Sequence, residues 1–158
     1  AIGSVLGLLQ ELNVGWSQMV PQNVFNGAIG NVLDHIASKL VQEVFNLNSM
    51  TCDYQDLPVL KEIFQSIIAT SKVLCMMIED DLKPHAFENA DQMLEDCAPD
   101  YWPVFCLMTE MLGCDYQIFE KRKSEILMKL NGDQVKKLMA LNGVVNPDNG
   151  YNKLLGKR

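Results

Sequence analysis

The stretch PQNVFNGAIGNVLDHIASKLVQEVF, residues 21–45, carries a pair of adjacent apolar residues every four positions. This spacing is typical of an α-helix, and four residues overshoot one turn of the helix by about 40°. The apolar stripe therefore winds around the helix axis from one pair to the next. A helix with such a stripe must be covered by several neighbours, so the stretch predicts a long helix buried on more than one side.

Two glycines three residues apart, Gly27 and Gly30, interrupt this helical pattern. A dinucleotide-binding loop would need a third glycine and a preceding strand, and a P-loop would need Gly-Lys-Ser/Thr. A backbone clamp for nucleic acid would need basic flanks, yet the nearest lysine is Lys39. We therefore expect both glycines to let another helix pack closely, which offsets some of the helix propensity that glycine lacks.

The remaining sequence is also predicted to be helical. Proline, asparagine and aspartate mark the boundaries: Pro21 opens the long helix, Asp56 caps the next one, Asp100 caps a fourth, and Asn146-Pro147 starts the last. Asn131-Gly132 and Asn142-Gly143 are interpreted as helix stops. The expected helices cover residues 1–19, 21–45, 56–82, 100–119, 124–130, 133–141 and a last one from residue 146. Residues 84–99 are expected to form mostly a loop.

No strand-like alternation competes with these helices, so the predicted fold class is an all-α helical bundle. With 158 residues, 48 % of them hydrophobic, the chain is expected to form a single domain over residues 1–158. It begins at Ala1 within an apolar pattern that has no cap, which favours a fragment excised from a larger protein. Membrane insertion and secretion are disfavoured, and five unpaired-looking cysteines favour a reducing, cytoplasmic compartment.

Charge is divided unevenly along the chain. The net charge of −7 combines 4 basic and 17 acidic residues up to Glu120 with 9 basic and 3 acidic residues from Lys121 onward, which is −13 followed by +6. Eight acidic residues lie between Glu79 and Asp100 against a single lysine, Lys83. The acidic segment would repel nucleic acid and anionic lipid, so nucleic acid is not an expected partner.

Signals for catalysis and for bound cofactors are weak. The two histidines, His35 and His85, lie in different elements without a second ligand at metal-binding spacing. The cysteines that fall in hydrophobic patterns lack a nearby activating base. Neighbouring carboxylates such as Asp80 and Asp81 are more typical of solvated acidic segments than of catalytic pairs. We therefore expect no catalytic residue, no metal site and no cofactor.

Two segments are candidates for binding a protein partner. The basic C-terminal part is the first, and the alternatives left open for it are an acidic partner surface, anionic lipid, or a solvated face that binds nothing. The second is a docking segment in which acidic and aromatic residues adjoin, a combination typical of short recognition motifs. The candidate residues are Lys136, Lys137, Lys153, Lys157 and Arg158 in the basic part, and Glu95, Asp96, Tyr101 and Trp102 in the docking segment.

Several runs of residues resemble the C-terminal domain of the zeste-white-ten family. The clearest are WSQMVPQNVF from Trp16 and the following Ala28-Ile29-Gly30. Further matches are Trp102-Pro103, DQVKKL from Asp133, and the closing Leu154-Leu155-Gly156-Lys157. The resemblance covers nearly the whole chain but departs from the family pattern in the acidic segment and in residues 142–152.

The resemblance implies a non-enzymatic subunit of a multi-protein complex. At kinetochores the family assembles with rough deal and Zwilch and supports the spindle checkpoint and dynein recruitment. At the endoplasmic reticulum it joins a complex that tethers Golgi-derived vesicles with SNAREs. The implied fold is the stacked helical-bundle rod of exocyst-like tethers, with this domain at the tip, and the implied location is cytoplasmic with kinetochore and membrane-associated pools. A module binding anionic membranes and a small helical enzyme remain the alternatives.

Overall fold

A computed structural model describes residues 19–47, 54–76 and 94–156, together with a few single positions before residue 19. The side chains of Gln22, Asn23, Phe25, Asn26, Tyr54, Leu74, Cys75 and Met76 are not described. The expected first helix falls almost entirely outside these residues. So do His85, most of the acidic segment, and the last two candidate residues, Lys157 and Arg158.

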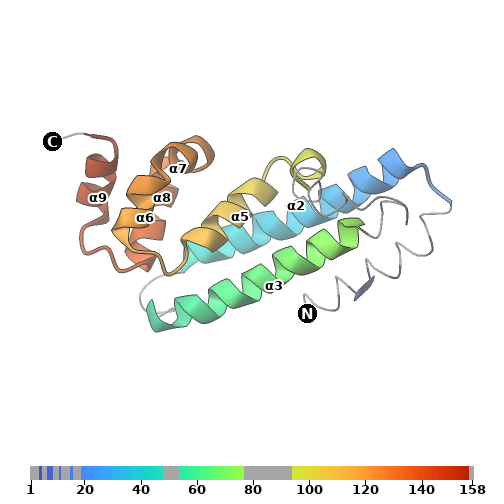
Figure 1. The fold of residues 1–158 in the computed structure, drawn as a ribbon, viewed down its shortest axis with the longest axis horizontal. Coiled ribbons are helices and arrows are strands. Elements are labelled where there is room, and N and C mark those ends of the chain that lie inside the picture. The colour runs from blue at the N-terminus through green and yellow to red at the C-terminus, as the bar shows by residue number, and fades with distance from the viewer. Residues whose placement is uncertain are drawn as a thin grey trace. The chain divides into compact units, whose positions relative to one another are not determined.

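The regular elements of the described residues are helices, with no strand among them (Figure 1). This confirms the all-α prediction. In chain order they are α2 (Gln22–Asn46), the 3₁₀ helix η1 (Tyr54–Asp56), α3 (Leu57–Met76), α5 (Trp102–Met111), α6 (Tyr116–Lys121), α7 (Lys123–Lys129), α8 (Gly132–Leu141) and α9 (Pro147–Leu154). Residues 94–97 form a further helical turn before α5.

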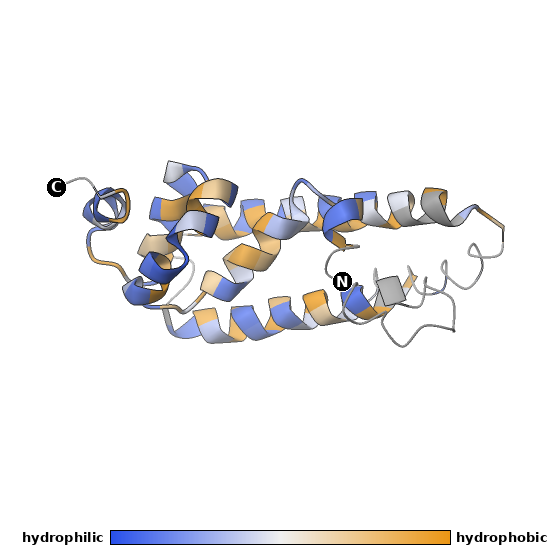
Figure 2. Ribbon diagram, turned by 45° about the horizontal axis from the view of Figure 1, so that its top comes forward, coloured by the Kyte–Doolittle hydropathy of each residue, from blue (hydrophilic) through white to orange (hydrophobic). Residues whose placement is uncertain are grey.

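The two long helices begin where the sequence predicts. Helix α2 follows Pro21 directly, and α3 has Pro58 at its second position, where the amide that proline lacks would have no partner within the helix. Apolar and polar residues are interspersed along both helices (Figure 2). The buried apolar side chains of α2 follow the winding stripe, and they are Ile29, Leu33, Ala37, Val41, Val44 and Phe45.

The chain divides into two compact units, and α2 and α3 contribute to both. Unit 1 contains Ala1–Ser38 and Gln65–Pro103, and unit 2 contains Lys39–Phe64 and Val104–Arg158. Buried apolar side chains of unit 1 include Leu33, Ile67, Leu94 and Trp102. In unit 2 the rings of Phe64 and Phe105 lie with their centroids 5.2 Å apart. The single-domain organisation over residues 1–158 stays a prediction.

The fourth predicted helix is wrong in two respects. Asp100 does not cap α5; instead Asp34 of α2 accepts hydrogen bonds through Oδ1 from the backbone amides of Tyr101 and Trp102, at 2.7 and 3.0 Å. The helix also does not continue to residue 119. It ends at Met111, and Gly113 takes a left-handed φ of 73°, a conformation that side chains resist. Asp115 then caps the separate helix α6.

The asparagine-glycine pairs play different roles from each other. Gly143 adopts a φ of 75° after α8, which confirms that Asn142-Gly143 ends a helix. Asn131, in contrast, is extended at φ −77° and starts α8. Its side chain accepts a hydrogen bond from the Gln134 amide while the Gln134 side chain accepts one from the Asn131 amide, which is a capping box. The interpretation of Asn131-Gly132 as a left-handed stop is therefore wrong.

Candidate protein-binding surface

The basic C-terminal candidates that the structure describes lie on α8 and α9 in unit 2. We call Lys136 and Lys137 of α8, together with Lys153 of α9, the basic surface. Helix α8 is fixed by the capping box at Asn131, and α9 begins where the Asn146 side chain accepts a hydrogen bond from the Asn149 amide, with Pro147 in the first position. This confirms the predicted start of the last helix. These caps thus fix where both lysine-bearing helices start.

The side chain of Lys136 makes its contacts within the chain. Its Nζ lies 2.8 Å from Oδ1 of Asp148 on α9 and 5.6 Å from the centroid of the Tyr151 ring. The hydrogen bond and the negative charge of Asp148 raise the pKa of Lys136 above its ordinary value. Lys136 therefore links α8 to α9, and Asp148 offsets much of its positive charge.

Lys153 is placed by an aromatic contact of the same kind. Its Nζ lies 5.3 Å from the centroid of the Tyr116 ring, at a distance where a cation is attracted to the face of an aromatic ring. The Tyr116 hydroxyl donates a hydrogen bond of 3.2 Å to the Gly150 carbonyl. Burial, followed by the charge of Glu120, raises the pKa of Tyr116. Tyr116 therefore stays an uncharged donor that ties α6 to α9 beneath Lys153.

Lys137 lies next to Lys136 on α8 and, like Lys153, is exposed. The structure thus brings three of the five basic candidates onto two adjoining helices. Two of them are ordered by tyrosines that the charge pattern did not single out. The arrangement presents fixed positive charges beside aromatic rings, and this chemistry suits carboxylate groups on a partner.

One residue of the predicted docking segment is buried. The segment consists of Glu95, Asp96, Tyr101 and Trp102. Trp102 is only 2 % exposed and belongs to the core of unit 1, so its indole is not accessible to a partner. Tyr101 is 41 % exposed, and Glu95 and Asp96 are exposed as well. Of the two aromatic residues in the predicted segment, only Tyr101 remains at the surface, because the amphipathic start of α5 turns the tryptophan inward.

The two glycines of α2 have different surroundings. A Cβ atom built on Gly30 would lie 2.1 Å from the carbonyl oxygen of Cys97 and 2.6 Å from its carbonyl carbon. One turn of helix, residues 94–97, therefore approaches α2 more closely than any side chain would permit. At Gly27 no described atom lies within 4 Å of such a Cβ. The close approach expected at both positions is thus seen at Gly30 and not at Gly27.

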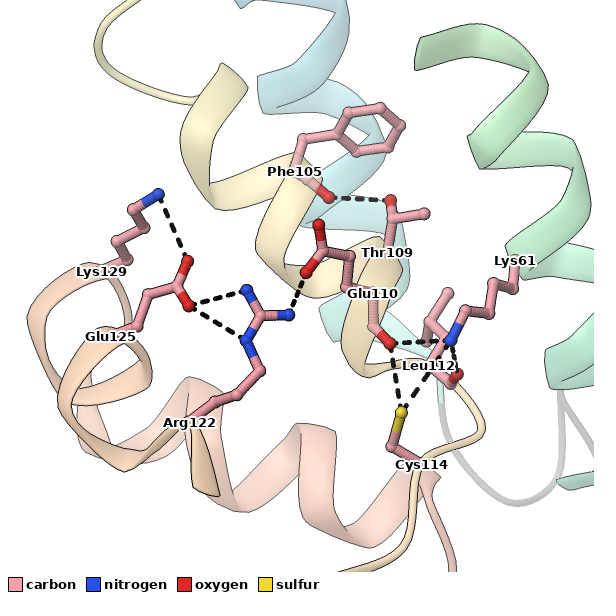
Figure 3. A network of polar contacts seen from close by, with 9 residues as sticks. All are labelled: Lys61, Phe105, Thr109, Glu110, Leu112, Cys114, Arg122, Glu125 and Lys129. Atoms are coloured by element: carbon pink, nitrogen blue, oxygen red, sulfur yellow. Dashed lines mark hydrogen bonds and ion pairs between the residues drawn. The ribbon is translucent and has the colours of Figure 1, made fainter. Parts of the chain in front are cut away.

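A polar network in unit 2 was not predicted from the sequence (Figure 3). Lys61 of α3 donates hydrogen bonds from Nζ to the carbonyl oxygens of Glu110 and Leu112, at 2.8 and 3.1 Å. These carbonyls lie at the C-terminal end of α5, where backbone acceptors lack partners within the helix and a positive charge is favourable. Residues 49 and 51 positions apart are joined in this way, so no local pattern could have shown it.

Arg122 forms the other centre of this network. Its Nε and Nη2 donate to Glu125 Oε2 at 3.0 and 2.7 Å, and its Nη1 donates to Glu110. Figure 3 shows the guanidinium between the two carboxylates. The spacing of Arg122 and Glu125, three residues apart, was a sequence signal for their pairing, whereas the link to Glu110 was not.

The described part of the chain holds neither a cluster of metal ligands nor a membrane-spanning helix. Within residues 19–47, 54–76 and 94–156, no three His, Cys, Asp or Glu side chains are grouped so that they could hold a metal ion. None of the helices in those ranges combines the length and the apolar character that crossing a membrane requires.

The described residues form an all-α domain of capped helices, in which two lysines of the basic surface lie beside tyrosine rings. The chain belongs to the ZW10 C-terminal helical domain family, whose model matches residues 1–142. This is a family of non-enzymatic structural and tethering proteins. No curated protein and no solved structure matches the chain. The family match includes Lys136 and Lys137 of α8 but ends before α9, so Lys153 lies beyond it.

Proposed function

We propose that this chain is a non-enzymatic subunit of a multi-protein complex and that the basic surface binds an acidic surface on another subunit. Membership of the ZW10 C-terminal helical domain family supports a role as a complex subunit. The observation that carries the binding proposal is the fixed placement of Lys136 and Lys153 beside tyrosine rings, with Lys137 exposed beside them. Ordered charges lose less conformational entropy on binding than freely moving ones do.

The proposed cellular roles are those of the family. At kinetochores the chain would act with rough deal and Zwilch in the spindle checkpoint and in dynein recruitment. At the endoplasmic reticulum it would act with the corresponding tethering-complex subunits and SNAREs in capturing Golgi-derived vesicles. The protein would be cytoplasmic, with kinetochore and membrane-associated pools, and this domain would form a protein-binding tip of a helical rod.

A pull-down with variants tests this proposal. The wild-type chain is used as bait in a cytosolic extract, and rough deal or its tethering counterpart is the expected protein. Lys137→Glu is the informative variant because Lys137 is exposed, whereas Lys136→Glu would set a second carboxylate beside Asp148 and disturb the fold. Lys39→Glu on α2 makes the same charge change at another exposed site and serves as the matched control.

The expected result is capture by the wild type and by Lys39→Glu, and reduced capture by Lys137→Glu at unchanged helix content. Equal capture by all three chains would refute the basic surface as the contact. Failure of the folded wild type to capture either partner would refute the proposed partners.

Anionic membrane is the second candidate for the same surface, because juxtaposed lysines are attracted to acidic lipid headgroups. Sedimentation with vesicles containing phosphatidylserine distinguishes the two. Salt-sensitive binding that Lys137→Glu reduces would favour the membrane, whereas absence of binding would leave the acidic protein surface as the ligand.

A further inference from the structure

Ser124 has a sequence environment that no other hydroxyl residue of this chain shares. It follows Lys121-Arg122-Lys123, and every other serine and threonine lacks a lysine or arginine among its three preceding residues. Many serine/threonine kinases select substrates by the pairing of such basic residues with acidic groups in the kinase groove. The charge pattern therefore singles out one hydroxyl in 158 residues.

The fold leaves this hydroxyl accessible. Ser124 is exposed, whereas Phe119 and Ile126 on either side of the segment are completely buried. The residues from Glu120 to Glu125 thus lie between two fixed points and are themselves at or near the surface. A kinase could engage this segment while the two buried anchors stay in the core.

Helical geometry is also interrupted within this segment. Helices α6 and α7 have only six and seven residues, and Arg122 between them departs from helical geometry with φ −100° and ψ 16°. No side chain caps the start of α7. Helices this short depend on tertiary packing, which Phe119 and Ile126 provide on either side of Arg122. A local opening confined to the residues between these two anchors costs less than unfolding the domain. The extended conformation that a kinase binds is therefore reachable.

Arg122 gives a modification at Ser124 a structural consequence. Its guanidinium is shared between Glu125 and Glu110, and the second contact joins α7 to α5 (Figure 3). A phosphate two residues away would offer this guanidinium a stronger bidentate partner than a carboxylate. Because Glu125 follows Ser124 directly, the phosphate would also repel that carboxylate. Both effects weaken the present arrangement of Arg122.

We infer that Ser124 is a phosphorylation site for a serine/threonine kinase that selects basic residues before its target, and that the phosphate takes Arg122 from Glu110. In the reaction the Ser124 oxygen attacks the γ-phosphorus of ATP, the bond to the β-phosphate oxygen breaks, ADP leaves, and the hydroxyl proton passes to the kinase's base. The phosphate adds a charge of about −2, which lowers the +6 balance after Glu120 to about +4.

A regulatory consequence follows that rests on the proposed function. If the basic surface binds acidic groups, the added negative charge in unit 2 weakens that binding, and the weakening is greatest at low salt. Phosphorylation would then release the partner. The modification itself and the change at Arg122 do not depend on the identity of the partner.

The test incubates the purified folded chain with ATP and a basophilic kinase such as cyclic-AMP-dependent protein kinase, and locates phosphate by mass spectrometry. We expect phosphate on Ser124 and its complete loss in Ser124→Ala. A peptide covering residues 119–128 is the unfolded reference. Absence of phosphate from Ser124 in the chain overturns the inference, whether or not the kinase modifies the peptide.

A second measurement tests the switch of Arg122. The Nη–H signals of Arg122 in a nitrogen-15 NMR spectrum should shift on phosphorylation, because Nη1 is the atom that donates to Glu110. Glu110→Ala should shift the same signals in the unmodified chain, because it removes the acceptor. An unchanged Arg122 signal in the phosphorylated chain would refute the partner exchange. These results stand even if no partner binds either form, so failure of the proposed function is distinguished from failure of this inference.

Discussion

Replacing Gly30 of α2 with alanine tests the close approach on which unit 1 depends. The new Cβ would lie 2.1 Å from the Cys97 carbonyl oxygen and 2.6 Å from its carbonyl carbon, so backbone atoms must move. Overpacking of this kind costs about 1–3 kcal/mol, and a backbone clash belongs at the upper end. Alanine returns about 1 kcal/mol through its better helix propensity. We expect a net loss of about 2 kcal/mol in the free energy of unfolding.

Gly27→Ala is the matched control, three residues away in the same helix. No described atom lies within 4 Å of its new Cβ, so the propensity gain of up to about 1 kcal/mol should remain. In thermal unfolding followed by circular dichroism, Gly30→Ala should lower Tm by about 4–8 °C and Gly27→Ala should raise it by about 2–4 °C. Shifts of the same sign and size at both positions would refute the close contact at Gly30.

Three further predictions concern single polar contacts. Asp34→Ala removes the acceptor that caps α5 and should lower the free energy of unfolding by about 0.5–2 kcal/mol in urea titrations, while no change would show that water replaces the cap. Lys61→Met keeps the aliphatic stem but leaves two carbonyls without their charged donor, and should cost about 1–3 kcal/mol in the same assay. Asp148→Asn should bring the raised pKa of Lys136 back toward its ordinary value of 10.5, as measured by NMR titration of the ammonium group. Because the pKa of Lys136 is raised in the folded state, the pair with Asp148 stabilises the fold fully below pH 10.5, and this stabilisation is lost as the pH rises through the raised pKa. An unchanged pKa of Lys136 in Asp148→Asn would contradict the pairing.

Helix starts were predictable because their causes lie within a few residues. Pro21, Pro58 and Asn146-Pro147 act on the backbone beside them, through a missing amide or a side-chain acceptor, and the structure has helices beginning at each. The winding stripe of α2 also appears as predicted, since burial follows the spacing of apolar pairs. These features need no knowledge of which segments meet.

The errors arose where a distant residue decides the outcome or where two local signals compete. Asp34 caps a helix 67 residues further along the chain, so a search near α5 found only Asp100. At Gly113 the apolar spacing continues through residue 119 and predicts one helix, whereas the glycine ends α5 and Asp115 caps a new helix. At Asn131 the same residue type is able to end a helix or to begin one, and Gln134 three residues later decides for the second.

The charges of the candidate site could be predicted from the sequence, but the contacts of its lysines could not. A count of lysines identifies Lys136 and Lys153, yet only the fold shows that Asp148 and Tyr116 hold them in place. The same fold buries Trp102, which composition alone had placed in a docking segment. The charge pattern therefore predicts the surface, and tertiary packing decides which of the candidate residues are accessible.

The affinity of the chain for its proposed partner is the most direct test of the account. Isothermal titration calorimetry would compare the wild type, Lys137→Glu and the control Lys39→Glu against purified rough deal or its tethering counterpart at two salt concentrations. We predict that Lys137→Glu weakens binding about tenfold, which is ~1.4 kcal/mol, with the larger effect at low salt, while Lys39→Glu binds as the wild type does. Equal dissociation constants for all three chains at both salt concentrations would contradict the assignment of the basic surface as the partner contact.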